Sequence, residues 1–287
     1  MVETIRLEML ADRVQRLPTL PTIYTRVSVL MADPNSSVAE IGRVVAHDQA
    51  IAAKLLNVVN SSFYGFRQQI TTVTRAMTMV GFRGLKELML ALAVLPALGS
   101  LKHKEFNDAV FWSHAVGCAA CARAAAVILR LPDPEESFTA GLLHDIGKLA
   151  EYQFMNEGFI KLLETSHVDN TPMHELEMSA LGYTHADVGR LLARKWQFPE
   201  TLTEAIAWHH QPARAQRGAQ QAAVIHVADI ISRALMLGDP YDARVPPLDA
   251  SAWELSGLKQ DQISLLMRRT ETEYEKGKSF VSIILNR

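Results

Sequence analysis

The apolar positions of this chain recur with the period of an α-helix along almost its whole length. After Asp48, for example, Ile51, Leu55 and Val59 fall on one side of a helix and form a stripe that can pack against a core. No comparable stretch alternates strictly between apolar and polar residues, as a half-buried strand would. The pattern therefore predicts an all-α protein, with helices at about residues 3–16, 22–32, 37–46, 48–60, 72–80, 85–95, 104–130, 157–168, 185–196, 250–256 and 259–276. Three further helices should carry residues 141–149, 200–210 and 226–229.

Capping residues, prolines and glycines stand where these helices should begin and end. Ser37 and Glu40 form a capping box, in which the hydroxyl and the carboxylate satisfy free amides at the start of a helix. Residues 81–84, Gly-Phe-Arg-Gly, should interrupt the chain between two helices. A later turn divides the chain into an N-terminal helical subdomain, residues 1–100, and a second helical region, residues 101–287.

Composition narrows the classes of protein to consider. A chain of 287 residues with 48% hydrophobic residues can bury a large core, and its net charge of -2 gives no general attraction to nucleic acid or anionic membranes. The longest apolar run, residues 88–99, is too short to span a bilayer and contains Pro96. The N-terminus lacks the basic and apolar segments of a signal peptide, so we expect a cytoplasmic protein. Cys118 and Cys121 indicate small buried residues rather than a zinc site, because a zinc site would need a second pair.

One polar pair interrupts the apolar segment 141–149. His144 and Asp145 stand side by side between Leu143 and Ile146, which belong to a buried helical face. A buried imidazole and carboxylate must be satisfied from inside the protein. A hydrogen bond between the two side chains would do this, and so would a bound metal ion.

Other residues able to bind metals lie in separate predicted helices, namely His114, His185, His209, His210 and Asp229. Most of them have a simpler explanation when taken alone. His114 fits a hydrogen-bonded core histidine, His185 a residue at a helix start, and the histidine pair a helix C-terminus, where imidazolium complements the helix dipole. Asp229 is harder to explain, because a buried carboxylate is costly without a partner and the next basic residue is Arg233.

The order of these residues resembles the HD phosphohydrolase superfamily, and their spacing is similar to its HD-GYP branch. Over residues 14 to about 210 the chain resembles the HDOD family of bacterial signalling proteins, a relative of that superfamily. The resemblance is closest at residues 57–65, where a leucine-rich helix ends in Asn-Ser and an aromatic-Gly turn. It implies a multi-helix HD-domain-like bundle with a metal site. By this resemblance His114, His144, Asp145 and Asp229 would hold a first metal, and Asp145, His185, His209 and His210 a second.

Imidazole and carboxylate ligands suit iron, manganese, zinc or nickel, so we expect one or two divalent transition metals. A bridging Asp145 could hold two ions close enough to activate one water. Lys148 lies one helical turn beyond His144, where its ammonium could reach a phosphate near the metals, or it is a solvated lysine. Asp145 and Lys148 are therefore the candidate catalytic residues. His226, three positions before Asp229, could support the ligands.

The chain departs from the HD-GYP pattern directly after its paired histidines. That branch has a Gly-Tyr-Pro segment around its cyclic di-GMP pocket, whereas residues 211–218 of this chain are different and include Arg214 and Arg217. These arginines could replace the segment only if the loop folds inward. Many HDOD relatives also lack part of the metal set and act as regulatory modules.

Two functions follow from these observations. The favoured one is a regulatory module of bacterial signal transduction that binds signalling proteins or a small nucleotide ligand, with residues 51–66 as its working surface. The alternative is a metal-dependent phosphohydrolase or phosphodiesterase acting on a nucleotide or cyclic dinucleotide. DNA binding through a helix-turn-helix at residues 37–60 is disfavoured, because Lys54 is the only basic residue of its second helix.

Overall fold

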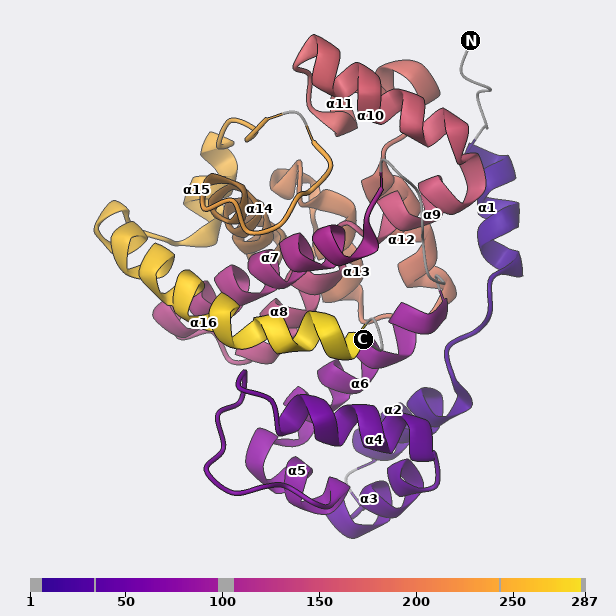
Figure 1. Cartoon of the computed structure of the whole chain (residues 1–287), viewed down its shortest axis with the longest axis vertical. Helices are drawn as coiled ribbons and strands as arrows, with labels where there is room; N and C mark the ends of the chain where they lie inside the picture. The colour runs from indigo at the N-terminus through magenta and orange to yellow at the C-terminus, as the bar shows by residue number, and fades with distance from the viewer. Residues whose placement is uncertain (1–6, 34, 98–105, 243, 285–287) are drawn as a thin grey trace.

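The computed structural model describes residues 7–33, 35–97, 106–242 and 244–284, and these residues contain no β-strand, which confirms the all-α prediction (Figure 1). The α-helices are α1 (Leu7–Arg16), α2 (Thr22–Ala32), α3 (Val38–Ala46), α4 (Gln49–Val59), α5 (Val73–Val80), α6 (Phe82–Ala97), α7 (Asp108–Leu129), α8 (Pro134–Leu143), α9 (Ile146–Met155), α10 (Glu157–Asp169), α11 (Met173–Leu181), α12 (His185–Lys195), α13 (Glu200–Trp208), α14 (Ala219–Ala234), α15 (Ala250–Ser256) and α16 (Ile263–Ile284). Two 3-10 turns, η1 (Pro212–Arg214) and η2 (Gln260–Gln262), complete the description.

Helix α7 is the central element of the fold, because α8, α14 and α16 all pack against it. Small residues allow the close approach: a Cβ atom on Gly141 of α8 would lie 2.7 Å from the backbone of Ala119 in α7. Cys118 and Cys121 are buried, free thiols on this helix, as expected. The helix is long and apolar enough to cross a membrane, but 72% of its most apolar window is buried inside the protein. That burial is what the central helix of a helical core requires.

The N-terminal helices do not all lie together. In Figure 1, α2 to α5 form one end of the molecule, whereas α1 lies beside α9 and α12. An Arg13 guanidinium N–H donates to the carbonyl of Phe154 at 2.6 Å, and the Trp196 indole N–H donates to the carbonyl of Pro18 at 3.1 Å. The first helix therefore packs on the second region, and the predicted boundary near residue 100 lies outside the described residues.

The turn that most resembles the HDOD family joins the two regions. Phe63 is buried, and its ring centroid lies 4.9 Å from that of Phe138 in α8. The Tyr64 hydroxyl donates to the Glu135 carboxylate at 3.4 Å, and Arg123 of α7 lies over the Phe63 ring. The aromatic residues of this turn are thus part of a joint between subdomains.

Two local predictions were wrong. Only Gly81, with φ at 89°, separates α5 from α6, because residues 82–84 already belong to the second helix. The single helix expected through residues 141–149 is two helices, with His144 and Asp145 at their junction. Asp145 leaves the helical conformation (φ -100°, ψ 12°), and this break presents two adjacent side chains to the same interior space.

Candidate metal centre

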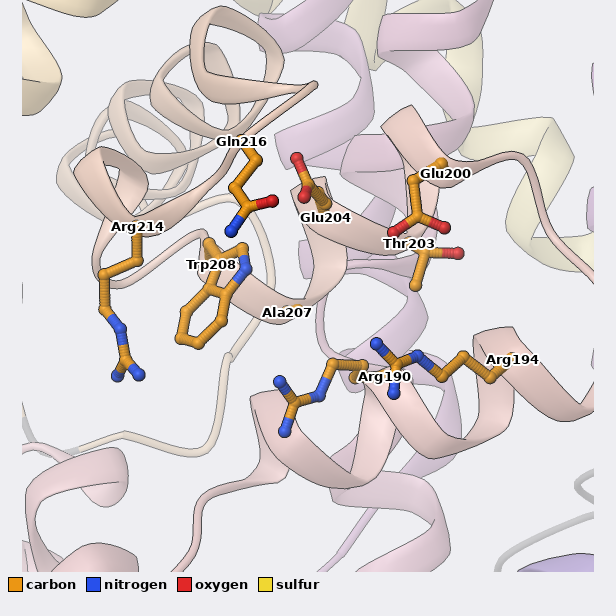
Figure 2. A pocket seen from close by; sticks show the side chains of 9 residues that line it. All are labelled: Arg190, Arg194, Glu200, Thr203, Glu204, Ala207, Trp208, Arg214 and Gln216. Atoms are coloured by element: carbon orange, nitrogen blue, oxygen red, sulfur yellow. The ribbon is translucent and has the colours of Figure 1, made fainter.

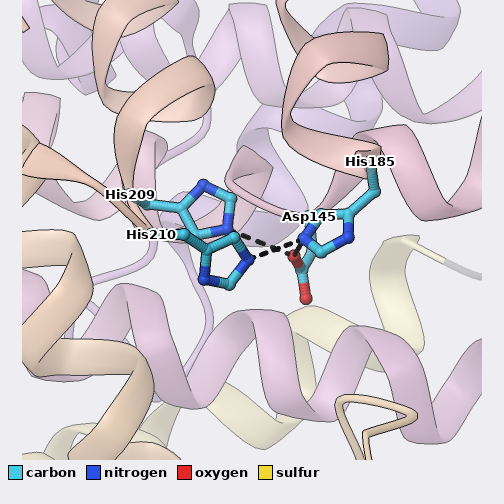
Figure 3. Close-up of side chains that lie close together, drawn as sticks. All are labelled: Asp145, His185, His209 and His210. Atoms are coloured by element: carbon cyan, nitrogen blue, oxygen red, sulfur yellow. Dashed lines mark hydrogen bonds and ion pairs between the residues drawn. The ribbon is translucent and has the colours of Figure 1, made fainter. Parts of the chain in front are cut away.

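All seven predicted ligands lie in helices or directly beside helix ends. His114 lies in α7, His144 and Asp145 at the junction of α8 and α9, His185 at the start of α12, His209 and His210 after α13, and Asp229 in α14. The structure brings six of them into two groups whose ligand atoms lie within 4.8 Å of one another. One group is Asp145, His185, His209 and His210 (Figure 3), and the other is His114, His144 and Asp145. We call these residues, together with Asp229, the metal centre.

Asp145 is the residue shared by both groups. Its Oδ1 atom lies 3.1 Å from His185 Nε2 and 3.6 Å from His209 Nε2. Its Oδ2 atom lies 3.4 Å from His144 Nε2 and 2.8 Å from Lys148 Nζ. Burial would raise the pKa of the Asp145 carboxyl, but His144 and the ammonium of Lys148 hold it well below its usual range. The carboxylate is therefore ionised and faces imidazoles on both sides.

The rings are held so that Nε2 faces the centre. His144 Nδ1 lies 2.7 Å from the Gly141 carbonyl, and His209 Nδ1 lies 2.8 Å from the Ile206 carbonyl. Because a carbonyl can only accept, each Nδ1 carries the proton and each Nε2 offers a lone pair. Both Nε2 atoms are buried without a hydrogen-bond partner. This is the arrangement by which proteins orient metal-bound imidazoles, so the residues fit a divalent metal ion.

His185 is oriented by a carboxylate. Its Nδ1 lies 2.7 Å from Glu177 Oε2, and its backbone N–H donates to the same oxygen at 2.8 Å. Burial would lower the pKa of His185, but the carboxylates of Glu177 and Asp145 reverse this and raise it. The space between His185 Nε2 and the Asp145 carboxylate therefore favours a positive charge, which either a second ring proton or a metal ion would supply.

At the predicted first metal position, unlike the second, the Arg233 guanidinium already pairs with one of the ligands. His114 Nε2 lies 3.0 Å from Asp229 Oδ1, but Arg233 Nε donates to the same oxygen at 2.8 Å. A second Arg233 nitrogen lies 2.9 Å from the Asp242 carboxylate, and all three charged side chains are almost completely buried. Burial would raise the pKa of Asp229, but Arg233 holds it well below its usual range. Asp229 adjoins the ligand group and already has a permanent counter-charge.

Lys148 is not a solvated lysine, because its side chain is completely buried. Its ammonium donates to Asp145 Oδ2 at 2.8 Å and to the Pro240 carbonyl at 2.9 Å. Burial would lower the pKa of Lys148, but Asp145 and Asp242 raise it, so the group stays charged. Lys148 thus lies at the centre as predicted, where it neutralises a ligand.

Several residues of the centre were missed by the sequence analysis. Glu177 had no local signal, because eight residues and a turn separate it from His185. Arg233 did have a local signal, because it follows Asp229 by four positions in a helix, a spacing at which side chains meet. His226 had been identified as a supporting residue: its Nδ1 lies 2.8 Å from the carbonyl of His209. It therefore fixes the backbone of a ligand.

The turn after His210 folds along the outside of α13. The guanidinium of Arg214 is exposed and lies 4.1 Å from the ring centroid of Trp208. The backbone N–H of Arg217 donates to Glu204 at 2.5 Å, and its side chain is exposed. Neither arginine therefore takes the place of a phosphate-binding group inside the metal centre.

Comparison with known proteins gives a consistent family match. The model of the HDOD domain family matches residues 17–212. An uncharacterised protein of Treponema pallidum (strain Nichols) is 28% identical over 205 residues, which cover 70% of this chain and only 39% of that protein. A crystal structure from Shewanella amazonensis SB2B, provisionally described as a phosphohydrolase, has a TM-score of 0.75 and 25% identity, with coverage of 96% of this chain and 97% of the other. An HDOD domain protein of unknown function from Geobacter sulfurreducens shares the fold, with a TM-score of 0.76 and 22% identity over 96% of this chain and 97% of its own.

Proposed function

This chain belongs to the HDOD family, and we propose that it is a regulatory module of bacterial signal transduction whose metal centre has a structural role. The observation that carries this proposal is that the metal centre is almost completely shielded from solvent. His114, His144, Lys148 and His185 are 0% exposed, Asp145 and His209 are 1% exposed, and Asp229 is 2% exposed. Among the residues of the centre only His210 is partly exposed. A hydrolase must bring a phosphate into contact with a metal-bound water, and this centre presents little surface to a substrate.

The buried cations of the centre support the same proposal. Phosphoryl transfer needs positive groups placed where charge develops on the substrate. Lys148 is instead bound to Asp145 and Pro240, and Arg233 to Asp229 and Asp242. A displacement of about 1 Å can lower a rate ~100-fold, so cations committed elsewhere are a serious obstacle to catalysis. We therefore expect turnover of cyclic di-GMP to be weak or absent.

The charges favour one divalent ion. The ionised groups are Asp145, Glu177, Asp229 and Asp242 on the negative side, and Lys148 and Arg233 on the positive side. Burial and neighbouring Glu177 raise the pKa of Glu151 well above its usual range, so Glu151 is neutral. Against the effect of burial, neighbouring carboxylates also raise the pKa values of His144 and His185, but a histidine that binds a metal is neutral. With the histidines neutral, the four negative groups exceed the two positive ones by two, and one divalent ion balances them. A second ion would leave buried charge without compensation, which is costly.

We infer that this ion is held by Asp145, His185, His209 and His210. That group does not include Asp229, which Arg233 already neutralises. In it, His185 Nε2 lies 3.1 Å from Asp145 Oδ1 and 2.9 Å from His210 Nε2. Iron, manganese, zinc and nickel all suit such ligands. When bound, the ion would supply a Lewis acid, while the protein groups would orient the imidazoles and exclude bulk water.

The alternative, a metal-dependent phosphohydrolase, is supported by the convergence of the ligands and by the provisional description of the Shewanella amazonensis protein. Elemental analysis of protein purified without chelator, followed by assays of the same sample on cyclic di-GMP, pGpG and mononucleotides, separates the two functions. Metal without turnover would support the regulatory module. Robust turnover that disappears in both Asp145→Ala and His209→Ala would overturn it.

The working surface is also part of the proposal. We propose that residues 51–66 contact a signalling protein, and Asn57 is an exposed position on α4 where a charge can be introduced. A two-hybrid screen would identify a binding partner, and Asn57→Arg and Asp145→Ala would then be compared. Loss of binding in Asn57→Arg alone would place the surface on α4, whereas loss only in Asp145→Ala would place it at the metal centre.

A further inference from the structure

A surface pocket lies against α12, α13 and η1, and its lining contains no residue of the metal centre (Figure 2). Its volume is about 210 Å³. Three guanidinium groups, an indole, a hydroxyl and a carboxylate are prominent in its lining: Arg190, Arg194, Arg214, Trp208, Thr203 and Glu204. We call it the outer pocket.

Positive charge dominates the outer pocket. Arg190 and Arg194 come from α12 and Arg214 from η1, whereas the acidic residues of the lining are Glu200 and Glu204. The carboxylate of Glu204 is already used, because its Oε2 accepts the backbone N–H groups that follow η1. The lining thus carries three positive and two negative groups, and its net charge is positive.

The guanidinium groups have donors to spare. Arg190 donates to Asp187 at 3.2 Å, and Arg214 donates to Gln211 at 3.0 Å. Each guanidinium has five N–H donors, so most of them remain free for a ligand. Both groups also lie over the indole of Trp208, with ring-centroid distances of 5.4 Å and 4.1 Å. The cation–π contacts hold them on the same side chain and therefore close to one another.

Buried groups beneath the outer pocket fix its shape. Glu204 is only 9% exposed, and it accepts from the backbone of Arg217 at 2.5 Å and of Gly218 at 2.9 Å. These bonds hold the end of the turn that places Arg214 over Trp208. A site that is arranged before its ligand arrives loses less conformational freedom on binding. The outer pocket is therefore a built feature of three connected elements, α12, α13 and η1.

We propose that the outer pocket binds a nucleoside phosphate. Arginine forks match the oxygens of a phosphate and bind it through paired charge-assisted hydrogen bonds. The guanidinium of Arg190 is the more distant of the two from the indole of Trp208, at 5.4 Å against 4.1 Å. When Arg190 turns to the phosphate, the indole gives a planar base a surface on which to stack, as aromatic side chains do in many nucleotide sites. The volume lies below the ~300 Å³ at which drug-sized ligand sites begin, so the pocket suits one nucleotide unit better than a polymer.

This inference goes beyond the proposed function and does not depend on a metal. The outer pocket and the metal centre share two helices, because α12 begins with His185 and α13 is followed by His209. The substitutions in the outer pocket nevertheless leave every ligand of the metal centre in place. Each variant can therefore be compared with the wild type at the same metal content, so a failure of this inference is distinguishable from a failure of the proposed function.

The test is calorimetric titration of the full chain with GMP, AMP and inorganic phosphate. Loss of one charged hydrogen-bonding group should weaken nucleotide binding about 10-fold or more in Arg190→Ala and in Arg214→Ala. Arg217→Ala is the matched control, because it removes an exposed arginine from the same loop that does not line the pocket. It should leave the Kd within about 2-fold. Unchanged thermal unfolding would show that the variants fold.

Trp208 provides a second measurement. The difference in fluorescence between the wild type and Trp208→Phe isolates the signal of this indole, and a nucleotide should quench it in the wild type. Absence of binding at millimolar concentrations would overturn the proposal, as would binding that survives both arginine substitutions. Equal affinity for inorganic phosphate and for both nucleotides would overturn the assignment to a nucleoside phosphate.

Discussion

Replacing Arg233 with methionine tests the charge balance of the metal centre directly. Methionine keeps a long unbranched stem and removes the guanidinium that pairs with Asp229 at 2.8 Å and Asp242 at 2.9 Å. All three side chains are almost fully buried, so both carboxylates lose a counter-charge that solvent cannot replace. Breaking a buried pair in this way typically costs about 3–5 kcal/mol.

That loss should be visible as a lower melting temperature in metal-free protein. For a chain of this size about 1 kcal/mol corresponds to ~2–4 °C, so Arg233→Met should lower Tm by roughly 6–20 °C. Arg190→Met is the matched control, because its partner Asp187 is partly exposed at 3.2 Å. Such a pair contributes about 0–1 kcal/mol, so the control should lose no more than roughly 4 °C.

Added metal should then show whether Arg233→Met loses stability through the missing charge or through altered packing. With the guanidinium gone, Asp229, His114, His144 and Asp145 are free to hold an ion. Differential scanning calorimetry with and without manganese should show that metal restores much of the Tm of Arg233→Met. Elemental analysis should find two ions per chain in the variant and one in the wild type. The reasoning is refuted if Arg233→Met melts with the wild type in the absence of metal, or if its metal content stays at one.

Three further predictions concern single side chains. Glu177→Gln weakens the acceptor for His185 Nδ1 and should lower metal affinity about 10–100-fold in a chelator competition, with the helical circular dichroism unchanged; unaltered affinity would remove Glu177 from the centre. Asp145→Ala should lose most of the bound metal on elemental analysis, and a wild-type metal content in the variant would exclude Asp145 as the shared ligand. Burial raises the pKa of Glu87 from 4.5 to about 7, so the unfolded chain releases this proton at lower pH than the folded chain does. The contribution of Glu87 to the free energy of unfolding is therefore full below about pH 4.5 and is lost as the pH rises to about 7. Denaturant unfolding of Glu87→Gln should lack this decline, and a variant with the same pH profile as the wild type would contradict the prediction.

The helical fold was predictable because the apolar period and the caps agree along the chain. Ser37 and Asp48 accept the amide hydrogen bonds expected of helix caps, and α3 and α4 begin one residue after them. The histidines and acids of the metal centre were recognisable for the related reason that polar groups in apolar helices need partners. The helices that the local sequence pattern favours are thus the helices that the folded protein contains.

The features that the sequence did not predict depend on contacts between segments that are far apart in the chain. No periodicity marks Asp145 as a helix break, because the break follows from backbone conformation at the junction. Asp242 meets Arg233 only after the loop beyond α14 has folded back. The outer pocket is similar: Arg190, Trp208 and Arg214 become neighbours only when η1 turns along α13. Such groups are determined by tertiary packing and carry no signal at fixed spacing.

The position of α16 limits how this molecule can move. Helix α16 packs on α7 and reaches α4 (Figure 1), so it connects the second region to the helices at the other end of the molecule. Helix α16 and the aromatic turn at Phe63 therefore span the same joint, although they lie far apart in the sequence. A hinge rotation between the regions would have to break both contacts together. A signal passing through this protein should thus alter local order at a surface while the two regions keep their relative orientation.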